Sequence, residues 1–219
     1  MGGILVSLLN PVKNKTLYSS NHSSVTFKLI LGSSSPYRAE LLQRLRLPFV
    51  TVTPNIDESP LASESAADTA LRLAIQKAEK VSEKHRDAYV IGCDQVIECL
   101  GKRLGKPFTK ERAREQLTWV SGKKVLLYSA LCLVNHQNNT QHSHVAVAEI
   151  HYRELGQGEI DAYLALEPSF DCAGGVKIEG LGISLVEKIS CDDPSAIVGL
   201  PLISLNRMLQ AEGIYAIAH

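Results

Sequence analysis

The sequence predicts an α/β fold built on a mixed sheet. Through the first 120 residues, short apolar segments typical of strands alternate with longer segments whose apolar residues recur at helical spacing. Two long segments of alternating apolar and polar residues follow, joined by a polar connection typical of a hairpin. Because crossover helices join parallel strands and hairpins join antiparallel strands, both kinds of pairing are expected in one sheet.

Three local patterns predict the first strand, the first helix and the second strand. Residues 28–32 form an apolar run that ends in a Gly-Ser turn, as a buried strand does. Pro36 suits the first turn of a helix, and residues 39–45 carry apolar side chains at helical spacing. Residues 49–53 predict a second strand, which Pro54 ends.

The middle of the chain contains the clearest helix. Residues 65–84 place one apolar stripe along a helical face, with Lys77 inside it. The stripe consists of Ala67, Ala70, Leu71, Ala74, Ala78 and Val81. Residues 88–96 are rich in Val and Ile and predict a strand, and residues 110–119 predict a helix that stops before a Ser-Gly pair.

The second half predicts a hairpin and three shorter elements. Residues 125–134 and 145–152 alternate as strands do, and the polar segment 135–144 is expected to join them at an exposed tip. His136, His142 and His144 would lie at this tip, where the sequence offers no acidic partner for a metal site. The remaining elements are a helix over 157–166, a strand over 183–189 and a helix over 201–212.

The chain divides into one domain and two flanking segments. Residues 1–27 are expected to form a flexible extension, because residues 14–24 are polar and rich in Ser and Asn. No basic region precedes the apolar stretch 3–9 and no A-x-A site follows it, so a signal peptide is a poor interpretation. The folded domain is expected over 28–213, and 214–219 is expected to be a tail.

Charge and cysteine content exclude several classes of function. Lys and Arg total 23, as do Asp and Glu, so the chain has no general attraction to nucleic acid or to an anionic membrane. No apolar run approaches the roughly 18 residues that a membrane span needs. The 5 Cys include no C-x-x-C pair, which argues against a zinc ribbon or a disulfide scaffold and suggests a cytoplasmic protein.

The turn after the first strand is a candidate anion site. It reads Gly-Ser-Ser-Ser-Pro-Tyr-Arg, so a strand leads through a Gly/Ser turn into the start of a helix. Such a start points free N–H groups at an anion, Ser33 and Ser35 add hydroxyl donors, and Arg38 adds a guanidinium. The alternative is a helix start that the serines merely cap.

A second candidate is Asp94, which interrupts the apolar strand segment Ile-Gly-Cys-Asp-Gln-Val. A carboxylate inside a sheet is costly unless a cation, a metal or a proton-transfer role accompanies it. The alternative is an aspartate that caps a turn at the end of the strand. The close apolar neighbours favour a functional role.

Single charges and one glycine-rich segment complete the candidates. Glu58 follows a predicted strand, Lys77 lies in the helical stripe, and Lys106 lies in a Gly-Lys-Pro turn. Each has an ordinary alternative as a solvated loop residue, a lysine with a buried stem, or a turn cation. Residues 173–182 contain four glycines, which would let the backbone approach a flat ligand closely or would simply form a bulged loop.

These motifs occur in one order, and the set resembles the Maf family of nucleotide pyrophosphatases. The motifs are S-x-S-P-x-R, D-E, a helical Lys, G-x-D, G-K-P, A-G-G-x-x-x-E-G-x-G and V-G-L-P, and the resemblance covers about residues 28–213. The resemblance implies an inosine-triphosphate-pyrophosphatase-like α/β fold with two lobes around a cleft. It also implies hydrolysis of nucleoside triphosphates to the monophosphate and pyrophosphate with Mg²⁺ or Mn²⁺, and a possible homodimer.

The resemblance also implies roles for individual residues. Asp94 corresponds to the proposed general base, and Glu58 corresponds, with Asp94, to a metal-site residue. The expected phosphate-binding residues are Ser33, Ser35, Arg38, Lys77 and Lys106.

Three departures from the commoner family pattern imply a particular base. Tyr37, Gln95 and Glu179 resemble the subgroup that prefers 7-methyl-GTP, whereas the usual members hydrolyse dTTP, UTP or CTP. An aromatic face attracts the cationic ring of 7-methylguanine, and a carboxylate can accept hydrogen bonds from its N1–H and 2-amino groups. The alternatives are a pyrimidine-specific pyrophosphatase and a nucleotide-binding regulator of cell division without turnover.

Overall fold

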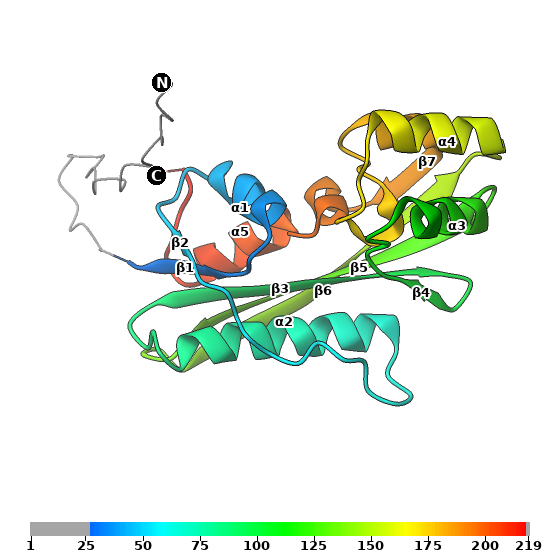
Figure 1. Cartoon of the computed structure of the whole chain (residues 1–219). Helices are drawn as coiled ribbons and strands as arrows, with labels where there is room; N and C mark the ends of the chain where they lie inside the picture. The colour runs from blue at the N-terminus through cyan, green and yellow to red at the C-terminus, as the bar shows by residue number, and fades with distance from the viewer. Residues whose placement is uncertain (1–26, 218–219) are drawn as a thin grey trace, which may run out of the picture.

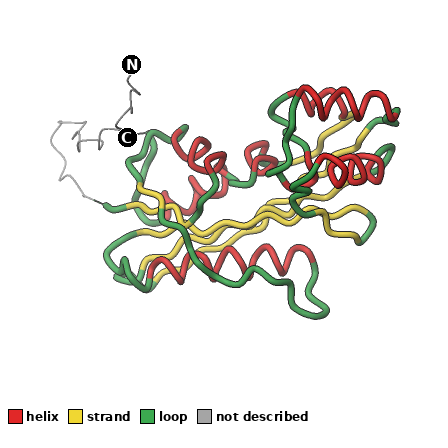
Figure 2. The backbone as a smooth tube through the Cα atoms, in the orientation of Figure 1, coloured by secondary structure: helices red, strands yellow, loops and turns green. Residues whose placement is uncertain are grey.

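A seven-stranded mixed sheet forms the middle layer of the computed structural model, which describes residues 27–217 (Figures 1 and 2). The strand order is β2-β1-β3-β5-β6-β7, and β4 pairs with β3. β1 lies parallel to β2 and to β3, and every other pairing is antiparallel, which confirms the predicted mixed sheet. The strands are β1 (Leu29–Gly32), β2 (Val50–Thr51), β3 (Tyr89–Cys99), β4 (Lys102–Leu104), β5 (Lys124–Asn135), β6 (Thr140–Tyr152) and β7 (Val186–Cys191).

One long helix, α2 (Ala66–Ser82), covers one face of the sheet (Figure 1). Ser65 caps it by accepting a hydrogen bond from the Asp68 backbone N–H at 3.1 Å. The buried face has the predicted helical period, although Ala66 is buried in place of Ala67 and Leu73 in place of Leu71. Gly92 of β3 faces this helix so closely that an added Cβ would lie 2.1 Å from the Ala74 carbonyl oxygen.

The opposite face carries two separate groups of helices (Figure 1). Helices α1 (Pro36–Gln43) and α5 (Leu202–Ala211) pack on the end of the sheet that contains β1. Helices α3 (Lys110–Val120) and α4 (Gln157–Leu166) pack at the far end. Each group has its own buried apolar cluster, so this side of the molecule forms two lobes.

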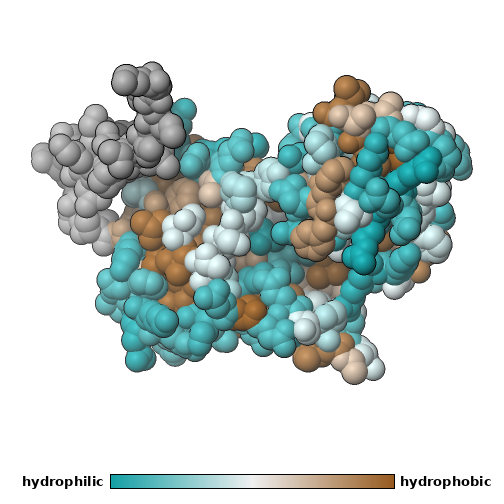
Figure 3. Space-filling view, viewed as in Figure 1, coloured by the Kyte–Doolittle hydropathy of each residue, from teal (hydrophilic) through white to brown (hydrophobic). Residues whose placement is uncertain are grey.

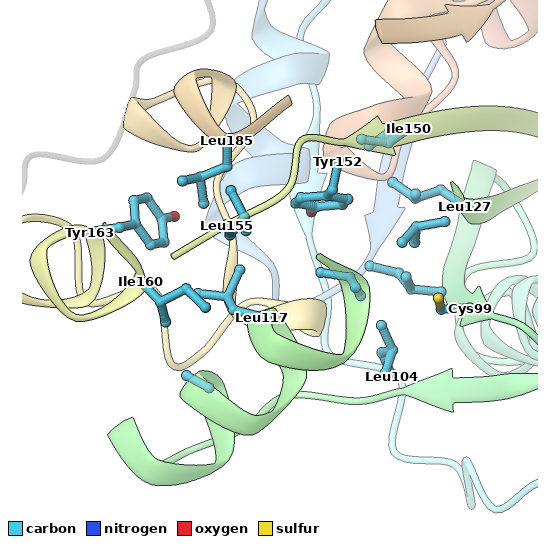
Figure 4. Packing of buried hydrophobic residues seen from close by; sticks show 14 of the residues in the cluster. Cys99, Leu104, Leu117, Leu127, Ile150, Tyr152, Leu155, Ile160, Tyr163 and Leu185 are labelled. Atoms are coloured by element: carbon cyan, nitrogen blue, oxygen red, sulfur yellow. The ribbon is translucent and has the colours of Figure 1, made fainter. Parts of the chain in front are cut away.

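The far lobe is held by large side chains that converge from helices and strands (Figure 4). Leu117 of α3 and Ile160 of α4 are both fully buried and belong to one cluster with Tyr152 of β6. The hydroxyl of Tyr163 in α4 accepts a hydrogen bond from the Lys177 backbone N–H at 3.2 Å. The glycine-rich segment is therefore fixed to this lobe.

Strand boundaries differ most from the sequence prediction. β2 has only two residues, and β4 was not predicted because its three residues carry two cations. Residues 181–185 form a 3₁₀ helix (Leu181–Leu185), so β7 begins three residues later than predicted. Short edge strands depend on pairing with neighbours more than on their own apolar pattern.

The predicted hairpin tip was also wrong in extent. β5 and β6 stay paired up to Asn135 and Thr140, so only residues 136–139 form the turn. His142 therefore lies within β6, and its Nε2 is 2.7 Å from a buried carboxylate oxygen of Glu212. The sequence suggested no acidic partner there, because Glu212 comes from the end of the last helix.

The domain boundaries suggested by sequence can be compared with packing only in part. Phe27 packs against the cluster below α1 and α5, and Ile214 is buried in the same cluster. Most of the expected extension, residues 1–26, lies outside the described residues. Across residues 27–217, no helix combines the length and apolar character needed to cross a membrane.

The Glu212 carboxylate predicts a pH-dependent stability. Burial raises its pKa, but hydrogen bonds from His142 and Asn138 outweigh burial, so the pKa lies below its ordinary value. A lowered pKa stabilises the fold above the ordinary pKa of the group, and this stabilisation is lost as the pH falls through the folded-state pKa. Glu212→Gln should therefore cost about 1.5 kcal/mol at neutral pH. Thermal melts should show the gap from wild type closing as the pH falls below the ordinary pKa of 4.5 and through the lower folded-state pKa, and a gap that is constant with pH would contradict the argument.

Candidate active site

A cleft of about 750 Å³ lies between the two lobes and around one edge of β3. The surface is notched between the two groups of helices in the space-filling view (Figure 3). β1 ends opposite Gly92 and the pairing with β4 reaches back only to Ile97, so within the described chain residues 93–96 of β3 have no strand partner on this edge. This interruption at the carboxyl end of β1 is where open α/β sheets commonly bind ligands.

Asp94, Lys77 and Glu58 meet at this edge. The Lys77 ammonium lies 2.6 Å from an Asp94 carboxylate oxygen and 2.9 Å from a Glu58 carboxylate oxygen. Lys77 is 5% exposed, so it is not a lysine that buries only its stem, and Asp94 is 7% exposed and lies within β3, so it does not cap a turn at the end of the strand. The close pairing explains how a carboxylate is tolerated in this strand.

Burial dominates the ionisation of Asp94. It raises the pKa of the carboxyl above its ordinary value, and the nearby cations Lys77 and Arg38 oppose the shift. A carboxylate with a raised pKa is a better proton acceptor near neutral pH than an ordinary one. The arrangement therefore supplies a buried carboxylate that can accept a proton beside two cations.

The segment that carries Glu58 crosses from the α1 side of the sheet to the α2 side (cyan in Figure 1). Arg72 of α2 holds it by pairing with both Glu64 oxygens at 2.7 and 2.9 Å and by donating to the Ser59 carbonyl at 3.1 Å. This bidentate pair lowers the pKa of Glu64 to about 2, against the opposing effect of desolvation. Sequence reasoning did not identify Arg72, which positions the loop rather than lining the cleft.

The serine turn is partly committed to capping its own helix. Ser35 caps α1 by accepting from the Arg38 backbone N–H at 3.4 Å, and Ser33 accepts from the Ser35 backbone N–H at 3.2 Å. Both serines line the cleft. The capping alternative is thus realised for Ser35, and it does not prevent a hydroxyl from also donating a hydrogen bond to an anion.

Arg38 is anchored by two backbone carbonyls. Its Nε donates to Gly199 at 3.0 Å, and its Nη1 donates to Cys93 at 3.0 Å, next to Asp94. Gly199 adopts a φ of 103°, a conformation that favours glycine, in the Val-Gly-Leu-Pro turn. This turn fixes the guanidinium at the wall of the cleft.

Gln95 points to the other face of β3. Its Nε2 donates to the Ser129 hydroxyl at 2.8 Å and to the carbonyls of Ala196 and Ile197 at 2.9 and 3.1 Å. The side chain also lines the cleft. The predicted specificity residue is therefore tied to the segment that precedes α5.

Tyr37 meets the glycine-rich segment across the cleft. Its hydroxyl donates to Asp171 at 3.3 Å, and the Lys177 ammonium lies 5.1 Å from the centre of its ring. The interaction with Tyr37 raises the pKa of Lys177. Glu179 is exposed and lines the same cavity. The sequence did not single out Asp171 or Lys177, which only their contact with Tyr37 identifies.

All ten residues predicted from sequence line this one cleft. They are Ser33, Ser35, Tyr37, Arg38, Glu58, Lys77, Asp94, Gln95, Lys106 and Glu179. Lys106 is exposed on the far-lobe side, and Arg103 of β4 is a further lining cation that sequence reasoning missed with its strand. Arg103 donates a hydrogen bond to the Glu64 carbonyl, which joins it to the loop that carries Glu58.

The donor set suits a divalent cation that binds together with a phosphate ligand. Within residues 27–217, no three His, Cys, Asp or Glu side chains gather into a group that could hold a metal ion alone. Glu58 and Asp94 nevertheless meet at Lys77, and Mg²⁺ commonly binds one or two protein carboxylates and completes its shell with water and substrate phosphates. The two carboxylates fit that mode of binding.

The chain is similar to proteins of one family over nearly its whole described length. The sequence model described as "Maf-like protein" matches residues 28–212. A protein of Ralstonia nicotianae named "7-methyl-GTP pyrophosphatase" is 53% identical over 83% of this chain and 94% of its own length. Proteins with the same name from Cupriavidus pinatubonensis and a Polaromonas species are 48% and 46% identical, over 85% and 95% of this chain and 94% of each relative.

Among solved structures, the Staphylococcus aureus Ham1 protein aligns with 84% of this chain and 99% of its own chain. The sequence identity is 13% and the TM-score is 0.49, a likeness too weak to support a statement about function.

Proposed function

The chain belongs to the Maf family, and from this premise we propose that it hydrolyses 7-methyl-GTP to 7-methyl-GMP and pyrophosphate. Relatives that are 46% to 53% identical carry the name of this activity. The observation that supports the proposal most strongly is the buried Asp94 carboxylate paired with Lys77 at 2.6 Å in a cleft lined by further cations. Pure ligand binding would not require a buried carboxylate beside an anionic ligand.

In the proposed complex, the triphosphate lies along the charged edge of β3. Arg38 approaches it from α1, Lys77 approaches it from α2, and Lys106 approaches it from the turn after β4. Ser33 and Ser35 add hydroxyl donors at the start of α1. Cations placed around the phosphates stabilise the charge that develops as the bond to the leaving group breaks.

Asp94 acts as the general base. Its carboxylate accepts a proton from a water molecule, whose oxygen forms a bond to the α-phosphorus while the bond between that phosphorus and the bridging oxygen breaks. The electron pair of the broken bond leaves with pyrophosphate. The Asp94 pKa, raised by burial, suits this role.

Glu58 and Asp94 would hold a Mg²⁺ or Mn²⁺ ion jointly with phosphate oxygens of the substrate. The bound ion would neutralise negative charge on the triphosphate. Lys77 holds the two carboxylates together, since its ammonium contacts both.

Tyr37, Gln95 and Glu179 recognise the base. The Tyr37 ring already attracts the ammonium of Lys177 in the free protein, which supports its use as a face for a cationic ring. Glu179 accepts hydrogen bonds from N1–H and the 2-amino group of 7-methylguanine. A carboxylate can accept two such bonds only from a base that carries two adjacent donors. Uracil and thymine offer one N–H between two carbonyl groups, and the carboxylate would repel these carbonyl oxygens.

Pyrophosphate release tests this function directly. The purified chain is incubated with 7-methyl-GTP, GTP, dTTP, UTP or CTP, each with Mg²⁺, Mn²⁺ or an excess of chelator. The expected result is metal-dependent release with a preference for 7-methyl-GTP over GTP of about 10-fold or more, because a desolvated cation–π contact is worth about 2 kcal/mol. Preference for a pyrimidine would retain the reaction and refute the base assignment. Binding without release from any nucleotide would instead indicate a regulator.

A further inference from the structure

The carboxamide of Gln95 is fixed in one of its two orientations. Three acceptors surround its Nε2, and two of them are the backbone carbonyls of Ala196 and Ile197, which can never donate. Rotating the amide by half a turn would place Oε1 against these carbonyl oxygens at about 3 Å and lose both of their hydrogen bonds. The NH₂ group must therefore face the segment before α5.

Ser129 completes this set of acceptors. A serine hydroxyl can either donate or accept, so by itself it would not decide the orientation of an amide. Here its single hydrogen is donated to the Ala196 carbonyl at 2.6 Å, and toward Gln95 only a lone pair remains. Ser129 is fully buried on β5, away from competition by water.

The two carbonyls are themselves held in place by a buried carboxylate. Asp193 is 5% exposed and accepts hydrogen bonds from the Ser195 and Ile203 backbone N–H groups at 3.2 and 2.8 Å. It therefore braces the 3₁₀ helix Pro194–Val198, which carries both acceptors, against the start of α5. The orientation of Gln95 is built into the fold rather than adopted on binding.

The consequence lies on the cleft side of Gln95. All three hydrogen bonds of this side chain use Nε2, and its Oε1 accepts none from residues 27–217. Gln95 lines the cavity, and its Oε1 is not among the buried side-chain atoms that lack a partner in the described chain, so this oxygen is an acceptor that a ligand can reach. A ligand group that contacts it must be a donor.

We infer that Ser129 is a positioning residue for base recognition, which, together with the carbonyls of Ala196 and Ile197, holds Gln95 so that its Oε1 accepts a hydrogen bond from the 2-amino group of 7-methylguanine. This inference rests on the proposed function. Glu179 takes N1–H and one hydrogen of the 2-amino group, and Gln95 takes the second hydrogen. The two carboxylate oxygens of Glu179 and the Oε1 of Gln95 match the three hydrogens on this edge of guanine, whereas a base that presents only carbonyl oxygens to them is repelled.

Kinetics with a base that lacks the 2-amino group test this role. The kcat/KM ratio of 7-methyl-GTP to 7-methyl-ITP is measured for wild type, Ser129→Ala and Ser82→Ala. Ser82 is the matched control, because it is also fully buried and donates to a backbone carbonyl, that of Glu79 at 2.9 Å, but lies on α2 away from the cleft lining. Ser129→Ala should lower the ratio about 3- to 10-fold, mainly through KM, as expected for one weakened hydrogen bond. An unchanged ratio, or an equal fall in Ser82→Ala, would overturn the inference.

A second measurement needs no substrate and therefore separates this inference from the proposed function. In ¹H–¹⁵N spectra, the Gln95 side-chain NH₂ should exchange with water at least about 10-fold more slowly than that of Gln137, which is exposed in the hairpin turn. Ser129→Ala should speed the exchange at Gln95, and Ser82→Ala should not. Equal exchange at the two glutamines in wild type would refute the fixed orientation, whatever nucleotide the enzyme hydrolyses.

Discussion

Asp94→Asn is expected to lower kcat for pyrophosphate release by about 10²- to 10⁴-fold, the usual contribution of a general base. Asparagine keeps the size of the side chain and can still accept a hydrogen bond from Lys77, which lies 2.6 Å from the carboxylate. It cannot accept the proton of the attacking water. Nucleotide binding, measured by calorimetry without metal, should remain within about 10-fold of wild type, because the phosphate-binding cations are unchanged.

The pH profile distinguishes loss of a base from loss of structure. The ordinary pKa of an aspartate is 3.8 and burial raises that of Asp94, so wild-type kcat/KM should fall as the pH drops through a value above 3.8. This acid limb should disappear in Asp94→Asn. The control is Asp87→Asn, since Asp87 also pairs with a lysine, Lys28 at 3.4 Å, but on the surface outside the cleft. Retention of more than about a tenth of wild-type kcat by Asp94→Asn would refute the base assignment.

Gly92→Ala should destabilise the fold by about 3 kcal/mol, the upper end of the usual cost of overpacking a core. The new Cβ would lie 2.1 Å from the Ala74 carbonyl oxygen and 2.5 Å from the Ala78 backbone nitrogen. Both atoms belong to the backbone of α2, which cannot yield as a flexible side chain could. The helix must move away from β3, so the melting temperature should fall by about 6–12 °C.

The same displacement should impair the site. The new methyl group would press on α2 at Ala74 and Ala78, and Lys77 lies between these two residues in the sequence of the helix. Asp94 lies two residues beyond Gly92 on β3. Gly158→Ala is the matched control, because nothing lies within 4 Å of a Cβ added there and Gly158 is in the first turn of α4. That variant should gain about 0.5–1 kcal/mol, since alanine favours helices over glycine. A melting temperature of Gly92→Ala equal to wild type would show that β3 and α2 are not in such close contact.

Local patterns were sufficient for the elements that bury one clear face. The helix predicted over 157–166 has those bounds in the structure, and Ser65 caps α2 at the predicted start. Local patterns were insufficient for β4 and for the ends of β5 and β6, where polar residues join the sheet only because a partner strand offers hydrogen bonds. The hydrogen bonds that stabilise such a segment come from the neighbouring strand, so the spacing of apolar residues in the segment itself does not reveal them.

In the candidate site, too, local sequence patterns predicted some features and missed others. A carboxylate within an apolar strand implied a cation, a metal or a proton-transfer role, and Asp94 meets the Lys77 ammonium. The ordered motifs implied the remaining candidates, all of which line the cleft. The sequence by itself thus determined the residue types, the mixed sheet and the family.

Only the tertiary structure decided how these residues are held. The Arg38 guanidinium is anchored by the carbonyl of Gly199, 161 residues away, and the Gln95 amide is oriented by Ser129 on a neighbouring strand. Lys177 reaches the Tyr37 ring from the opposite lobe. Such contacts depend on where packed elements bring backbone carbonyls and side chains together, and backbone carbonyls are common to every residue. No local spacing can therefore reveal which of them will meet a given donor.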